Sequence, residues 1–98
     1  MDVKVVTICG SMRFEKEMQQ IARELTTKNG YAVIQCIYGI TKNETESEQN
    51  NIVKAHYKKI DICDIVYVVN IGGYIGTSTT NEIKYAKSKG KQIIYHEN

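Results

Sequence analysis

Proline and tryptophan are absent from this 98-residue sequence, and phenylalanine occurs once. The chain also has no internal repeat, no linker-like stretch and no low-complexity segment, which excludes a repeat array or a tethered multidomain architecture. The formal net charge is only +2, and no block of basic residues stands out. We therefore expect no nucleic-acid partner and no membrane partner. The apolar run near the N-terminus is far too short for a signal peptide or a membrane span.

Cysteine is scarce, and its pattern excludes two further classes. Cys9, Cys36 and Cys63 are odd in number, lie in or beside apolar segments and form no CxxC pair. Such spacing supports neither a disulfide framework nor a zinc site. We expect a reduced, cytoplasmic setting, with no metal and no cofactor.

The remaining composition is that of an ordinary globular protein, with 42% hydrophobic and 24% charged residues. A chain of this length is near the small end for a self-sufficient hydrophobic core. We expect residues 1–98 to form one domain.

Strand and helix patterns alternate along the chain. Apolar, β-branched segments predict four strands, over residues 3–9, 31–37, 65–69 and 91–95. Apolar residues at helical spacing predict helices over residues 14–28 and 46–60, and a third helix that begins near Thr80 and ends at Gly90. A capping box, Thr45 with Glu48, marks the start of the second helix.

This alternation predicts an α/β fold. Right-handed crossovers between parallel strands place helices on both faces of a sheet, which gives a three-layer α/β/α sandwich. We expect a short parallel sheet with strand order 2-1-3-4, flavodoxin-like or Rossmann-like. In that order the chain reverses between strands 1 and 3, and ligands of such sheets bind in the crevice beyond the carboxyl ends of those strands.

A glycine-rich loop follows the buried strand at 65–69 and leads into the third helix. It contains Gly72, Gly73 and Gly76, followed by the hydroxyl residues from Thr77 to Thr80. Backbone N–H groups, hydroxyls and a helix N-terminus together form an anion-binding site. The ligand-binding candidates in this loop are Gly73, Gly76, Thr77 and Ser78.

A second glycine turn, Gly10-Ser11-Met12-Arg13, ends the first strand. Its backbone, the Ser11 hydroxyl and the Arg13 guanidinium could hold a phosphate. The structural alternative is a turn glycine, a serine that caps a helix and a solvated arginine. Both glycine turns open into the same crevice, which favours a ligand and makes Gly10, Ser11 and Arg13 phosphate-binding candidates.

Glu82 lies in the expected first turn of the third helix, beside the proposed anion site. Thr79 and Glu82 have the spacing of a capping box, in which the acid only satisfies the helix start. The glycine loop before them is more than a cap requires, since it allows a ligand to approach the backbone closely. We therefore interpret Glu82 as the candidate catalytic group.

These motifs resemble the nucleoside 2-deoxyribosyltransferase family. The similarity rests on GSMR at the first strand end, the strand after Asp64, the Gly/Ser/Thr loop and Glu82-x-x-x-Ala86. It is greatest for the small branch that includes the deoxynucleoside 5′-monophosphate N-glycosidases. The resemblance implies cleavage or transfer at the N-glycosidic bond of a (deoxy)nucleoside or its 5′-monophosphate, with a nucleoside or nucleotide as ligand. It further implies a homodimer or larger homo-oligomer.

The resemblance also assigns roles to residues. The glutamate at the position of Glu82 is the nucleophile that attacks the anomeric carbon. Residues that match Ser11, Arg13 and Ser78 hold the sugar or its 5′-phosphate.

Two positions depart from the family pattern. Thr7 stands where the monophosphate branch has a tyrosine, and His56 stands where the family usually has an aspartate. His56 has three interpretations: a ligand contact, a proton donor to the leaving base in place of the aspartate, or a packed core residue. The departures leave open a second function class, a non-catalytic nucleotide-binding module that uses the same pocket.

Overall fold

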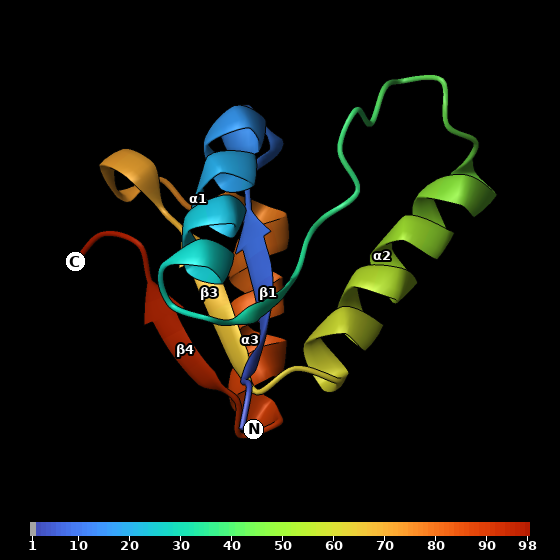
Figure 1. Ribbon diagram of the computed structural model, residues 1–98. Helices are drawn as coiled ribbons and strands as arrows, with labels where there is room; N and C mark the ends of the chain where they lie inside the picture. The colour runs from blue at the N-terminus through green and yellow to red at the C-terminus, as the bar shows by residue number, and fades with distance from the viewer. Residues whose placement is uncertain (1) are drawn as a thin grey trace.

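A computed structural model describes residues 2–98, and its four strands form a single parallel sheet (Figure 1). The strands are β1 (Val5–Gly10), β2 (Ala32–Ile34), β3 (Ile65–Val69) and β4 (Gln92–Tyr95), in the order β2-β1-β3-β4. This confirms the predicted strand order. The register pairs Gly10 with Val69, so β1 and β3 end side by side, where the crevice is expected.

Helices cover both faces of the sheet, which confirms the three-layer prediction (Figure 1). They are α1 (Glu15–Thr27) on one face, and α2 (Glu46–Asp61) and α3 (Thr77–Ser88) on the other, with short 3-10 turns at Met12–Phe14 and Ile71–Gly73. In the part of the chain that the structure describes, no helix combines the length and apolar character needed to cross a bilayer.

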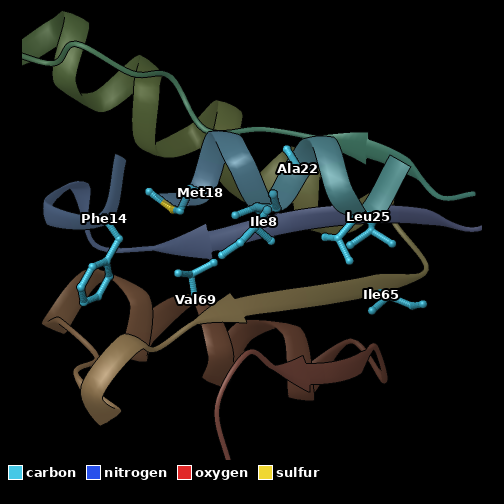
Figure 2. Close-up of a cluster of buried hydrophobic side chains, with 9 residues drawn as sticks. Ile8, Phe14, Met18, Ala22, Leu25, Ile65 and Val69 are labelled. Atoms are coloured by element: carbon cyan, nitrogen blue, oxygen red, sulfur yellow. The ribbon is translucent and has the colours of Figure 1, made fainter. Parts of the chain in front are cut away.

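Alternation along the two central strands divides the core into two clusters. The cluster under α1 contains Val6, Ile8, Phe14, Met18, Ile21, Ala22, Leu25, Ile65 and Val69 (Figure 2). The cluster under α2 and α3 contains Cys9, Ile60, Cys63, Val66, Val68, Ile83 and Ala86. Because successive strand residues point to opposite faces, Ile8 faces α1 and Cys9 faces the other two helices.

The second strand is shorter than predicted. Residues 31–37 were expected to pair, but only Ala32–Ile34 does. Beyond Ile34, side-chain hydrogen bonds replace the backbone pairing with β1. The Cys36 thiol donates to the Ile8 carbonyl at 3.3 Å, and Lys59 Nζ of α2 donates to the Gln35 carbonyl at 2.9 Å. The chain therefore leaves the sheet early and runs toward α2.

The start of the third helix also differs from the prediction. It begins at Thr77, earlier than the expected position near Thr80, and its N-cap is Gly76, which offers no side-chain cap. Thr79 is only 2% exposed and lies inside the helix, so Glu82 falls in the second turn. The capping-box interpretation of Thr79 and Glu82 is therefore wrong. By contrast, the predicted capping box at Thr45 is present in full.

Candidate functional site

A cavity of about 330 Å³ opens at the carboxyl end of the sheet, on the side of α2 and α3. Its lining includes seven of the nine residues predicted from the sequence: Gly10, Ser11, His56, Gly76, Thr77, Ser78 and Glu82. The other lining residues are Met12, Cys36, Ile37, Ile40, Ile52, Val53, Lys59 and Thr79. The two glycine turns and two helices thus meet at one hollow, as the position of the crevice predicts.

Gly10 brings three elements together at the floor of this cavity. A Cβ at this position would lie 2.9 Å from Met18 Sδ and 3.2 Å from Val69 Cβ, both of them buried. A side chain at this position would therefore push against Met18 of α1 and Val69 of β3. Ser11 follows as the cap of the 3-10 turn, with its hydroxyl accepting from the Arg13 N–H at 3.2 Å.

The start of α3 forms the opposite wall. Gly76 is the N-cap, and Thr77 and Ser78 occupy the first two helical positions with exposed side chains. The first N–H groups of an α-helix have no partner within the helix, and the positive end of its dipole points outward there. This wall therefore presents backbone N–H groups and two hydroxyls to the cavity.

Arg13 and Gly73 lie outside the lining. The Arg13 guanidinium carbon sits 3.6 Å from the centroid of the Tyr74 ring, a cation–π contact that holds the side chain against the loop. Gly73 belongs to the 3-10 turn after β3, where its φ of 78° is left-handed. Among the lysines and arginines of residues 2–98, Lys59 is the one that lines the cavity.

Three polar side chains from three different elements meet at the cavity wall, where His56 and Glu82 line the cavity and Cys9 is fully buried beside them. Cys9 extends from β1, His56 from α2 and Glu82 from α3. His56 Nε2 lies 3.3 Å from Cys9 Sγ and 3.6 Å from Glu82 Oε1. The histidine and glutamate side chains are 11% and 16% exposed, so both are mostly buried yet reachable from the cavity.

Burial favours the uncharged form of all three groups. It raises the pKa of the Glu82 carboxyl to about 7, partly offset by a hydrogen bond from the Cys9 thiol. It lowers the pKa of His56 to about 4, with a further lowering by the nearby charge of Lys59. It also raises the pKa of the Cys9 thiol well above its usual range, and the charge of Glu82 adds to this.

These shifts change the expected charge of the site. The position of Glu82 near a helix N-terminus predicts a carboxylate that ionises easily, whereas burial dominates and keeps a proton on it up to near neutral pH. His56 is correspondingly neutral at the same pH. The pair therefore carries one acidic proton, held by the carboxyl.

Thr7 does not line the cavity. It is fully buried, and its hydroxyl donates to the Lys59 carbonyl at 2.8 Å, which ties β1 to α2. Cys36, Lys59 and Thr79 are the polar lining residues that were not predicted as site residues, and Cys9, buried against His56, was missed as well. Strand alternation was the available signal, because Thr7 and Cys9 share a face of β1, and that face meets α2.

The architecture is similar to that of two solved enzyme structures. No family model and no curated protein matches the sequence. Among solved structures, the chain is similar to the CMP N-glycosidase BcmB of Clostridium botulinum, with 21% identity and a TM-score of 0.59 over 94% of this chain and 70% of that one. It is also similar to a 2-deoxyribosyltransferase from Leishmania mexicana, with 19% identity and a TM-score of 0.65 over 94% of this chain and 63% of that one.

The chain has the fold of these two enzymes. The predicted resemblance to deoxyribosyltransferases and nucleotide N-glycosidases is thus confirmed at the level of the fold. The chain spans about two thirds of the length of each neighbour, so part of each of them has no counterpart here.

Proposed function

We propose that this protein cleaves or transfers the N-glycosidic bond of a (deoxy)nucleoside or its 5′-monophosphate, with Glu82 as the nucleophile. The observation that carries this proposal is the position of the Glu82 carboxyl. It is mostly buried, faces a cavity large enough for a small ligand, and lies beside a helix N-terminus at the carboxyl end of a parallel sheet.

The reaction follows the pattern of a retaining glycosidase. A Glu82 oxygen bonds to the anomeric carbon as the bond from that carbon to the base nitrogen breaks, and the electron pair leaves with the base. Water or a second base then attacks the same carbon, and the glycosyl ester breaks to return the carboxylate. Hydrolysis and transfer thus differ only in the second attacking group.

His56 acts in this proposal by contact and not as a strong acid. Its lowered pKa makes the imidazolium scarce near neutral pH, so it is a poor proton donor to the leaving base. A neutral imidazole 3.6 Å from the carboxyl can instead orient Glu82, and the proton that the carboxyl gives up on ionising passes to solvent through the cavity. Of the three interpretations of His56, its place in the cavity lining supports a ligand contact, and its lowered pKa counts against a proton donor.

The anion-binding wall suits a 5′-phosphate or a sugar hydroxyl. Thr77 and Ser78 offer hydroxyls and helix N–H groups, and Ser11 faces them from the other glycine turn. Lys59 adds a positive charge to the lining. The sequence motif predicts that Arg13 binds the phosphate as well. For this its guanidinium must leave the Tyr74 ring when the ligand binds.

A non-catalytic nucleotide-binding module is the second candidate. The observation that favours it is Thr7, which is fully buried and bonded to the Lys59 carbonyl, so it offers no group to a substrate. The protonated state of Glu82 near neutral pH favours it as well. In that case ligands would bind in the same cavity without turnover.

A homodimer or larger homo-oligomer is part of the proposal. Ile37, Ile40 and Val53 line the cavity and are 51%, 41% and 54% exposed, which leaves an apolar rim in water. Apolar patches of this kind at a ligand site mark a surface that a partner or ligand covers. A second copy of the chain would complete the pocket on this side, and light scattering over a range of protein concentrations tests this by its mass.

Base release separates the two candidate functions. The wild type and Glu82→Gln are incubated with deoxynucleosides and their 5′-monophosphates, and free base is measured by chromatography. An enzyme releases base in the wild type, and the amide variant loses turnover by orders of magnitude because it cannot form the glycosyl ester. Undiminished release by Glu82→Gln would reject Glu82 as the nucleophile. Binding without release by the wild type would support the module.

A further inference from the structure

The three side chains that meet at the cavity wall carry three different metal-binding atoms. Cys9 Sγ, His56 Nε2 and a Glu82 carboxylate oxygen all lie within 4.8 Å of one another, and they form the one such group among residues 2–98. The sequence does not reveal this cluster, because its members lie far apart along the chain, on a strand and two helices, and match no metal-binding motif.

Two of the three separations match those of a tetrahedral zinc site, and the third is within 4.8 Å. Bond lengths of about 2.3 Å to sulfur and about 2.0–2.2 Å to nitrogen and oxygen put tetrahedral ligand atoms about 3.4–3.6 Å apart. The observed distances from His56 Nε2 are 3.3 Å to Cys9 Sγ and 3.6 Å to Glu82 Oε1. A rotation of the Cys9 or Glu82 side chain within this cluster would bring all three atoms to bonding distance of one ion.

The charges and the access also fit. A thiolate and a carboxylate balance a divalent cation, so a loaded site is neutral and suits a buried position. Without an ion, burial keeps the protons on Cys9 and Glu82, and an entering ion displaces both protons to solvent. His56 and Glu82 are partly exposed to the cavity, so the fourth coordination position of a bound ion would open into the cavity.

We propose that Cys9, His56 and Glu82 form a binding site for Zn²⁺ with one open position that faces the cavity. Thiolate, imidazole and carboxylate together are donors that zinc accepts, and an open tetrahedral position can take water or a ligand oxygen. If Glu82 is the nucleophile proposed above, bound Zn²⁺ occupies its attacking oxygen and inhibits base release. The metal site itself does not depend on the proposed reaction.

Cobalt substitution tests the site directly. Co²⁺ is titrated into the protein, first freed of metal with EDTA and then freed of the chelator, and the thiolate-to-cobalt absorption band is followed. We expect one equivalent to bind with this band and to be displaced by Zn²⁺. Cys9→Ser should abolish the band. His56→Gln and Glu82→Gln should each weaken binding by more than about 100-fold, since even the loss of a group that only hydrogen-bonds to a metal ligand costs about 10–100-fold.

Two other cysteines give matched controls. Cys36 lines the same cavity and Cys63 is buried outside it, so Cys36→Ser and Cys63→Ser should keep the band and its affinity. Folding of each metal-free variant is checked by circular dichroism. If Cys9→Ser does not fold, the affinities of the folded His56→Gln and Glu82→Gln decide. No band in the wild type, or an unchanged band in Cys9→Ser, would overturn the proposal.

The outcomes separate this inference from the proposed function. Cobalt binding by a protein that releases no base supports the metal site and counts against the enzyme. Base release that is insensitive to added Zn²⁺, in a protein that binds no cobalt, supports the enzyme and rejects the metal site. Inhibition by Zn²⁺ that EDTA reverses in the wild type, together with cobalt binding, supports both.

Discussion

His56 Nε2 and Glu82 Oε1 lie 3.6 Å apart on two different helices, and burial moves their pKa values in opposite directions. The carboxyl keeps its proton to about pH 7, and the imidazole stays neutral to about pH 4. The pair is therefore a neutral couple over the range in which an exposed glutamate and an exposed histidine would form an ion pair. Each pKa shift predicts a measurable pH dependence.

Glu82→Gln should stabilise the metal-free protein above pH 7. A raised folded-state pKa contributes stability that is fully present below the unfolded pKa, 4.5, and is lost as pH rises through about 7. At pH 8 the wild type holds a buried carboxylate that the amide lacks, so the variant should be more stable by about 2–3 kcal/mol. Urea unfolding at pH 5 and pH 8 measures the difference.

The control for this change is Glu46→Gln, which alters an exposed glutamate of α2. Its effect on the free energy of unfolding should not depend on pH in the same window. An equal difference between wild type and Glu82→Gln at both pH values would contradict a raised pKa at Glu82.

The His56 imidazole should remain neutral well below its usual pKa. Cys9, Lys59 and Glu82 are the titratable groups that face it, and burial is the main cause of its shift to about 4. Its neutral form is favoured by folding, so this contribution to stability is present above pH 6.5 and lost as pH falls through about 4. An NMR titration should show a midpoint for His56 below pH 5. A midpoint above 6 would contradict it.

Arg13→Ala should weaken binding of a 5′-monophosphate by about 1.5–3 kcal/mol, the loss of a charge-assisted hydrogen bond, and leave binding of the unphosphorylated nucleoside unchanged. Lys59→Gln is the comparison, because Lys59 lines the cavity while Arg13 contacts Tyr74. Isothermal titration calorimetry measures both. Weaker binding of the 5′-monophosphate by Lys59→Gln, with unchanged binding by Arg13→Ala, would show that Lys59 and not Arg13 contacts the phosphate.

Gly10→Ala should destabilise the fold by about 1–3 kcal/mol, the usual range for overpacking. The new methyl group would meet Met18 Sδ at 2.9 Å and Val69 Cβ at 3.2 Å. Gly76→Ala is the matched control, because its nearest neighbour is the Tyr74 hydroxyl at 3.5 Å. That change should cost under about 1 kcal/mol, the loss of a glycine N-cap. Equal free energies of unfolding for the two variants would refute the packing role of Gly10.

The fold could be predicted from the sequence because alternation of strand and helix patterns determines it. Parallel strands with right-handed crossovers leave few arrangements, and the crevice between β1 and β3 then brings Gly10 and Gly76 to one cavity. Five of the predicted lining residues came from motifs at the ends of elements: Gly10, Ser11, Gly76, Thr77 and Ser78. Such positions depend on the topology more than on side-chain detail.

The remaining features depend on side-chain packing and could not be derived from one sequence. The spacing of Thr79 and Glu82 matches a cap, but Gly76 begins the helix earlier and places the acid inside it. Arg13 follows the phosphate motif, yet the face of Tyr74 holds its guanidinium elsewhere. Cys9 is an ordinary strand residue until α2 and α3 bring two polar side chains against it.

The cluster of Cys9, His56 and Glu82 draws one side chain from each of three elements, so it exists only when β1, α2 and α3 are packed together. An ion or ligand that needs all three groups therefore binds the native state and not the unfolded chain. By mass action, free ligand at 100 times its Kd adds about 2.7 kcal/mol to the free energy of unfolding. Binding at this cluster and folding of the domain are therefore thermodynamically coupled.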